Sequence, residues 1–171
     1  MKRTSVPKSK TSNLKFYTAD HSTSPPTINM PRLFNAAHDL LERNIVEGRA
    51  AKIAYIDDDG RYTYEELCAR VNRSANALQK LGLKIEDRVM IVHSDTIDFP
   101  SVFLGAIKAG IIPVAVNTLL TPDDYEFMME DSRAKALIVS SSLLEKLGTA
   151  ITESEYLEHV IVSGDSNSEY H

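Results

Sequence analysis

The stretch that decides the fold is Asp87–Asn117, which reads DRVMIVHSDTIDFPSVFLGAIKAGIIPVAVN. It holds two short apolar runs rich in β-branched residues, 89–92 and 111–116, separated by a segment whose apolar residues recur at helical spacing. Two such runs joined by a helix predict a βαβ unit. A crossover of this kind places its two strands parallel in one sheet and is almost always right-handed.

The carboxyl ends of these two predicted strands carry His93 and Asn117. Ligands of parallel sheets gather at such ends, because loops and helix N-termini converge there. We therefore expect any binding site to lie at this edge of the sheet. A single histidine at a strand end is also typical of a hydrogen-bonded loop residue, and the residue types alone point to no particular reaction.

Three further helices are predicted from apolar periodicity and from the residues at their starts. One runs over 33–47 with Leu33 on its apolar side, a second runs from Thr63 to about Leu81, and a third starts at Thr121. Their predicted N-terminal signals are Asn35, the capping-box pair Thr63 and Glu66, and Thr121 followed by Pro122. In the third helix the residues expected to face the core are Tyr125, Met128 and Met129.

A β-hairpin is predicted where the segments 52–56 and 61–64 flank an acidic turn. An Asp-Gly turn between alternating apolar residues favours this structure. The acidic cluster also suggests calcium, but a calcium loop of the helix–loop–helix type needs its glycine at the sixth position. Gly60 is only the fourth residue from Asp57, so we prefer the turn interpretation.

Further strands are predicted over 136–139 and 159–162, with a short helix over 143–147 between them. Pro113 cannot donate to a ladder, which places its strand at a sheet edge or a bulge. The whole pattern predicts an α/β fold, with a largely parallel sheet flanked by helices and preceded by an N-terminal helix and the β-hairpin.

The net charge of −5 gives the chain no general attraction to nucleic acid or to anionic membranes. Residues 1–30 differ, because they hold five of the 19 basic residues and one of the 24 acidic residues. We interpret 1–30 as a disordered or loosely attached basic extension. A nucleic-acid-binding tail and a transit peptide are the alternatives for this segment.

Cys68 is the single cysteine, which excludes an internal disulfide and argues against a thiolate zinc site. It lies beside the apolar face of a predicted helix, so we expect a small packed side chain rather than a nucleophile. No apolar run approaches the roughly 18 residues of a membrane span, and the N-terminus lacks the apolar core of a secretory signal. These features predict a cytoplasmic protein with no membrane or nucleic-acid partner.

Motifs that would identify a reaction from residues alone are missing from the sequence. It contains no GxGxxG loop, no phosphate-binding loop ending in Gly-Lys-Ser/Thr, and no HExxH or GxSxG motif. No metal ligands are predicted either. The sequence therefore indicates a reaction only through its resemblance to a known family.

Four segments carry that resemblance: NAAHDLLERN (35–44), KIAYIDDDGRYTYEEL (52–67), DTIDFPSVFLGAIKAG (95–110) and VNTLLTPDDYEFMMEDSRAKALIVS (116–140). They resemble the start of an adenylate-forming acid–CoA ligase, and most of all the benzoate–CoA ligases. The similarity extends over about residues 34–144. The sequence motifs DTIDFP and NTLLTPDDY resemble those of the acid–CoA ligases that activate aromatic acids.

The resemblance implies a two-step reaction that serves the degradation of aromatic acids. ATP and an aromatic carboxylate such as benzoate give an acyl-adenylate and pyrophosphate, with Mg²⁺ neutralising the phosphates. The thiol of coenzyme A then displaces AMP. Stabilisation of charge on the phosphoryl oxygens would contribute most of the catalysis.

The family's phosphate loop, its nucleotide contacts, its aryl pocket and its C-terminal lysine are expected beyond residue 171. We therefore expect residues 31–171 to be an incomplete N-terminal α/β region of an AMP-binding ligase domain, with no catalytic residue in this chain. On its own the chain is expected to be inactive and to bind no ATP, CoA or Mg²⁺. Asn117 and Thr118 are the only candidate cofactor contacts, on the path of coenzyme A; a turn capped by Asn117 is the alternative.

Two other hypotheses compete with an enzyme portion. One is a truncated, non-catalytic pseudo-ligase that binds a partner through an exposed sheet edge. The other is an α/β interaction module such as a receiver domain, which needs an acidic pocket at strand ends with a lysine opposite. Here the acidic residues lie in a hairpin turn and in helix caps, which disfavours the receiver.

Overall fold

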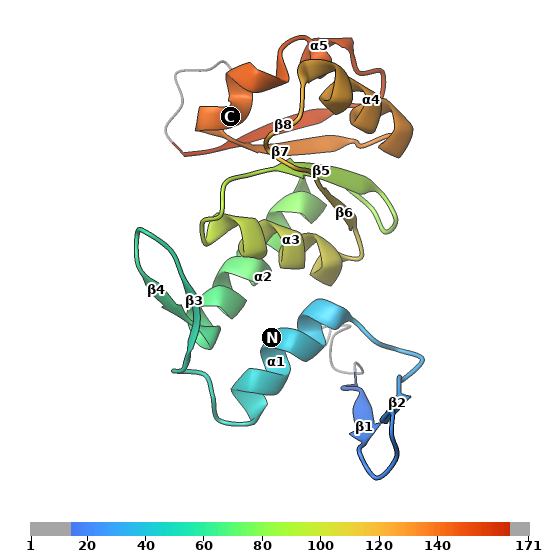
Figure 1. The fold of residues 1–171 in the computed structure, drawn as a ribbon, viewed down its shortest axis with the longest axis vertical. Coiled ribbons are helices and arrows are strands. Elements are labelled where there is room, and N and C mark those ends of the chain that lie inside the picture. The colour runs from blue at the N-terminus through green and yellow to red at the C-terminus, as the bar shows by residue number, and fades with distance from the viewer. Residues whose placement is uncertain (1–14, 165–171) are drawn as a thin grey trace, which may run out of the picture.

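The computed structural model describes residues 15–164 (Figure 1). Its centre is a four-stranded sheet in the order β6-β5-β7-β8, and all neighbouring strands are parallel. The strands are β5 (Arg88–Val92), β6 (Ile112–Ala115), β7 (Ala136–Ser140) and β8 (His159–Ser163). The predicted α/β fold with a parallel sheet is confirmed, and Pro113 lies in the edge strand β6, as its missing donor requires.

Helices cover both faces of this sheet (Figure 1). The helices are α1 (Ala36–Val46), α2 (Tyr64–Lys80), α3 (Asp98–Ala109), α4 (Pro122–Ser132), the 3-10 helix η2 (Ser141–Leu147) and α5 (Ala150–Glu153). On one face α2 and α3 pack against the sheet through Leu78 and Ala106. On the other face α4, η2 and α5 pack through a second core that contains Tyr125 and Leu147.

The central strand β5 explains why its run is apolar throughout. Val89 and Ile91 belong to the core on the α2–α3 side, whereas Met90 and Val92 belong to the core on the α4 side. All four side chains are fully buried. A strand covered on both faces has no solvent side, so it shows no alternation of apolar and polar residues.

The predicted helix starts are confirmed by side-chain hydrogen bonds. Asn35 accepts a hydrogen bond from the His38 amide at 3.1 Å. Thr63 and Thr121 each form a complete capping box with the residue three positions on. The local signals thus fix where three of the helices begin, before any tertiary contact is considered.

Some details differ from the sequence analysis. Met128 was expected in the core, but it is 37% exposed, because α4 turns only Tyr125 and Met129 fully inward. Leu33 precedes α1 and is exposed instead of joining its apolar side. The segment predicted as a short helix over 143–147 forms the longer 3-10 helix η2.

The acidic hairpin has the predicted form. Strands β3 (Ile53–Ile56) and β4 (Arg61–Thr63) pair antiparallel around the turn. Asp57 Oδ1 accepts hydrogen bonds from the amides of Asp59 and Gly60, so this carboxylate holds the turn together. Its second oxygen, Oδ2, accepts from the Ile97 amide at 2.8 Å and ties the hairpin to the start of α3.

The predicted N-terminal extension 1–30 lies partly outside the described residues, which begin at Lys15. Strands β1 (Thr18–Asp20) and β2 (Thr27–Asn29) form a short hairpin that the sequence analysis did not predict. In Figure 1 this hairpin extends away from α1. The division of the chain at residue 30 stays a prediction.

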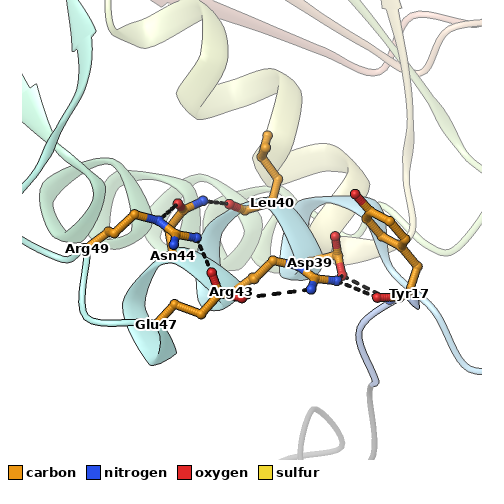
Figure 2. Close-up of polar contacts among 7 residues, drawn as sticks. All are labelled: Tyr17, Asp39, Leu40, Arg43, Asn44, Glu47 and Arg49. Carbon is orange, nitrogen blue, oxygen red and sulfur yellow. Dashed lines mark hydrogen bonds and ion pairs between the residues drawn. The ribbon is translucent and has the colours of Figure 1, made fainter. Parts of the chain in front are cut away.

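Figure 2 shows how the segment before β1 is fastened to α1. Asp39 Oδ1 accepts hydrogen bonds from the Tyr17 amide at 3.2 Å and from the Arg43 guanidinium at 2.6 Å. The same guanidinium donates to the Tyr17 carbonyl at 2.7 Å and lies over the rings of Phe16 and Tyr17. A buried carboxylate on α1 therefore binds Tyr17 directly, and it also binds the guanidinium that lies over the ring of Phe16.

Candidate functional site

The carboxyl edge of the sheet carries the candidate site. Each strand ends there in a polar residue or is followed directly by a polar turn: His93 follows β5, Ser140 ends β7 and Ser163 ends β8. Asn117 stands two residues beyond β6. The edge predicted from the βαβ stretch is thus extended by two serines that the sequence analysis did not single out. Their signal was a serine closing an apolar run, which is common and unspecific.

Hydrogen bonds connect neighbouring loops along this edge. The Ser94 amide donates to Ser140 Oγ at 3.0 Å, which links the end of β5 to the end of β7. Ser163 Oγ donates to Asp98 Oδ2 at 2.7 Å, which links β8 to the first residue of α3. These contacts give the edge a defined shape.

His93 is buried within this edge, with 6% of its surface exposed. Its Nδ1 lies 2.8 Å from the Ser94 carbonyl oxygen. Its Nε2 is buried and has no hydrogen-bond partner among residues 15–164. Leaving a buried polar atom unpaired costs about 1–3 kcal/mol, so the hydrogen-bonded loop interpretation accounts for only one of the two ring nitrogens.

Asn117 holds a turn, as the alternative interpretation of this residue predicted. Its Oδ1 accepts from the Leu119 amide at 2.9 Å, and its carbonyl oxygen accepts from the Tyr125 hydroxyl at 3.0 Å. The Thr118 carbonyl accepts from Lys146 Nζ at 2.6 Å. The loop between β6 and α4 is therefore fixed from both α4 and η2.

A hollow with a volume of about 320 Å³ brings the predicted residues together. It is lined by His93, Ser94, Asp95, Phe99, Ala115, Val116, Asn117 and Thr118. A second hollow, of about 240 Å³, opens towards Ser140 and Ser163, and His93 lines it as well. The arrangement offers a small, partly apolar binding surface with polar groups along it.

Neither a metal centre nor a reactive thiol emerges from the described part of the chain. Residues 15–164 contain no group of three or more His, Cys, Asp or Glu side chains that could hold a metal ion. Burial, reinforced by the Glu42 carboxylate, raises the pKa of the Cys68 thiol. A raised pKa disfavours the reactive thiolate. The geometry thus supports binding at the sheet edge and provides no complete set of reacting groups.

The comparisons with known proteins place this geometry in a family. The family model described as AMP-binding enzyme matches residues 41–170. The chain belongs to the AMP-binding enzymes. That match spans the sheet, its helices and every loop of the candidate site.

Two curated relatives narrow the similarity to ligases of aromatic acids. The chain is 49% identical over 152 residues to a benzoate–CoA ligase from Thauera aromatica. It is 43% identical over 135 residues to a 4-hydroxybenzoate–CoA/benzoate–CoA ligase from Rhodopseudomonas palustris. These matches cover 88% and 79% of this chain but only 29% and 25% of the relatives. The chain therefore spans less than a third of the length of the relatives it matches.

Solved structures of CoA ligases that act on aromatic acids also resemble the chain. A benzoate–CoA ligase from Burkholderia xenovorans LB400 matches with a TM-score of 0.71 and 47% identity, over 77% of this chain and 26% of that one. An anthranilate–CoA ligase, AuaEII, solved with anthranoyl-AMP, matches with a TM-score of 0.75 and 34% identity, over 81% and 27%. The expected fold, that of part of an adenylate-forming ligase, is confirmed.

Among the described residues, the structure contains no helix with the length and apolar character needed to cross a membrane.

Proposed function

We propose that this chain forms the N-terminal part of an ATP-dependent aryl acid–CoA ligase that acts on benzoate or a close relative of it. The similarity to a benzoate–CoA ligase at 49% identity carries the proposal. The substrate class follows from relatives whose names specify benzoate and hydroxybenzoate. In this proposal the chain supplies the sheet and its carboxyl edge, and other parts of the enzyme supply the reacting groups.

Coenzyme A is the cofactor whose fit the candidate site supports best. The hollow at Asn117 and Thr118 is lined by apolar atoms of Phe99 and Val116 and by polar groups along one side. Such a surface suits a narrow, uncharged chain with amide groups. When bound, coenzyme A supplies the thiol that accepts the acyl group. Asn117 would hold the β6–α4 loop in the shape that bound coenzyme A requires.

ATP and Mg²⁺ are assigned to the rest of the enzyme. The described residues offer no carboxylate cluster for a cation, and the hollow contains one carboxylate, Asp95, with no lysine or arginine in its lining. A triphosphate needs cationic or backbone-donor partners. We therefore expect the chain on its own to hold neither nucleotide nor metal, and to be inactive. We further expect a protein of the cytoplasm without nucleic-acid partners.

A hybrid enzyme tests the proposal. The residues of the Thauera aromatica benzoate–CoA ligase that this chain matches are replaced by those of the chain. At 49% identity, we expect a folded hybrid that forms benzoyl-CoA from benzoate, ATP and coenzyme A. The reassembled native ligase, prepared in the same way, is the control. A folded hybrid that forms neither benzoyl-adenylate nor benzoyl-CoA would contradict the proposed function.

A further inference from the structure

His93 contains the unexplained group of the candidate site. Its ring lines both hollows at the carboxyl edge, and it is almost entirely buried. One nitrogen is accounted for, because Nδ1 lies 2.8 Å from the Ser94 carbonyl oxygen. The other, Nε2, is buried without a partner among residues 15–164. Buried polar atoms are paired in the great majority of cases, so this nitrogen is expected to have a partner outside residues 15–164.

The Ser94 carbonyl determines what kind of ligand this is. A carbonyl oxygen only accepts hydrogen bonds, so Nδ1 must carry the hydrogen and donate it. In the uncharged ring Nε2 then has a lone pair and no hydrogen, and it can only accept. The group that completes His93 is therefore a donor, such as an amide N–H, a hydroxyl or a thiol.

The charge of the hollow narrows the class further. Asp95 is the only ionisable residue that lines the hollow besides His93, and its carboxylate repels phosphate and carboxylate groups. Lys146 donates to the Thr118 carbonyl and does not line the hollow. The occupant expected here is an uncharged donor rather than a phosphoryl or carboxylate group.

The aromatic lining of the hollow disfavours a purine base as the ligand. Phe99 is the only aromatic ring of the hollow besides His93, and it already stacks on Phe103, with ring centroids 5.9 Å apart. A purine would gain most from a free aromatic face, and Phe99 has one face occupied. A flexible chain with amide groups loses nothing by this arrangement.

We propose that His93 Nε2 accepts a hydrogen bond from the uncharged pantetheine arm of coenzyme A in this hollow. The inference rests on the proposed function, because it takes coenzyme A as a substrate. It adds a specific acceptor at the end of β5 to the turn held by Asn117. His93 is here a binding and positioning residue, and no proton transfer is assigned to it.

The test is a titration of the hybrid ligase with pantetheine, followed by long-range ¹H–¹⁵N NMR of its histidine rings. In the free hybrid we expect hydrogen on His93 Nδ1, because this nitrogen faces the Ser94 carbonyl oxygen. Pantetheine at millimolar concentration should move the Nε2 signal upfield and saturably. His38 is the internal control, because its Nδ1 is also buried without a hydrogen-bond partner among residues 15–164 but lies on α1, outside both hollows.

Variants and competing probes complete the test. His93→Leu should abolish saturable pantetheine binding, and His93→Gln, which keeps an acceptor, should restore part of it. Adenosine and inorganic pyrophosphate are expected to leave Nε2 unchanged. The proposal is overturned by hydrogen on Nε2 in the free neutral ring, by no response to pantetheine, or by a response to adenosine or pyrophosphate in its place. The titration of the unsubstituted hybrid decides this even where a variant fails to fold.

The titration contains neither ATP nor an aromatic acid, so its outcome is independent of ligase activity. Failure of the hybrid enzyme with a positive titration would remove the proposed reaction and leave the binding site. An active hybrid with a negative titration would remove the role of His93 alone.

Discussion

A Cβ atom built on Gly105 of α3 would lie 2.6 Å from the Cβ of Ser74 on α2. The same atom would lie 3.1 Å from the Ala75 amide nitrogen and 3.2 Å from the Val71 carbonyl oxygen, so backbone as well as side chain blocks it. The two helices that cover one face of the sheet can approach this closely only because residue 105 has no side chain. The core on this face of the sheet contains Leu78 of α2, Ala106 of α3 and Ile91 of β5.

Gly105→Ala is therefore expected to destabilise the chain by about 1–3 kcal/mol, the usual range for overpacking a tight contact. The effect should appear even though alanine favours a helix by about 1 kcal/mol over glycine. Urea denaturation followed by circular dichroism measures it. Gly60→Ala is the control, because its Cβ would meet only the Tyr62 ring at 3.8 Å. Equal or greater stability of Gly105→Ala would show that the helices can separate without cost.

A second prediction concerns acid stability. The backbone hydrogen bond from Thr63, and then the hydroxyl of the same residue, lower the pKa of Glu66 below its ordinary value of 4.5. A carboxyl group with a lowered folded pKa contributes stability that is present above the unfolded value and is lost as pH falls through the folded value.

Wild type should consequently lose more stability between neutral pH and pH values below 4.5 than Glu66→Gln, which cannot titrate. The measurement is the urea midpoint of both proteins across this range. Glu65→Gln, at the neighbouring exposed position without a capping hydrogen bond, is the matched control. Parallel pH curves for wild type and Glu66→Gln would refute a role for this carboxylate in the cap.

The hydrogen bonds that join Tyr17 to α1 give a third prediction. Asp39 Oδ1 is the acceptor for both the Tyr17 amide and the Arg43 guanidinium. Asp39→Ala removes both contacts and leaves a partly buried cation, which should cost about 1.5–3 kcal/mol. Hydrogen exchange at the Tyr17 amide should become much faster than in wild type. Asp58→Ala, at an exposed turn position, should leave it unchanged. Unaltered protection at Tyr17 in Asp39→Ala would mean that other contacts hold this segment.

Local rules predicted those parts of the fold that local chemistry decides. Thr63 with Glu66 and Thr121 with Asp124 form their caps from residues three positions apart, so a sequence is enough to find them. The parallel sheet was predicted from the two apolar runs 89–92 and 111–116 and the helix between them, because such a crossover places its two strands parallel. Pro113 placed its own strand at the edge.

Other features depend on contacts that no spacing reveals. Met128 and Met129 have the same chemistry, and only the position of α4 on the sheet decides which of them is exposed. Asp57 was recognised as a turn residue, but its bond to the Ile97 amide joins segments 40 positions apart. Coordinates were needed to show that His93 Nδ1 pairs with the Ser94 carbonyl and that Nε2 has no partner among the described residues. The sheet edge that carries the candidate site could be predicted from the sequence, but the hydrogen bonds along it could not.

A fourth prediction concerns Asn117 in the hybrid ligase. Asn117→Ala removes the hydrogen bond that holds the Leu119 amide and loosens the loop beside the hollow. We expect benzoate-dependent adenylation to stay near that of the hybrid and thioester formation to fall about three- to tenfold, the effect of one lost hydrogen bond of about 0.5–1.5 kcal/mol. Pyrophosphate exchange and benzoyl-CoA release measure the two steps separately.

Asn72→Ala, on the exposed side of α2, is the control for this substitution and should change neither step. Unchanged thioester kinetics in Asn117→Ala would remove this residue from the path of coenzyme A. A large loss of adenylation would instead place it near the nucleotide.

The central claim is that this chain builds the supporting sheet and its binding edge, and that the groups which activate the acid belong to other parts of the ligase. Benzoate-dependent exchange of pyrophosphate into ATP tests it most directly, on the purified 171-residue chain and on the hybrid under the same conditions. We predict exchange by the hybrid and none above background by the chain. Benzoate-dependent exchange by the chain alone would contradict the claim, because it would place the adenylation machinery within these residues.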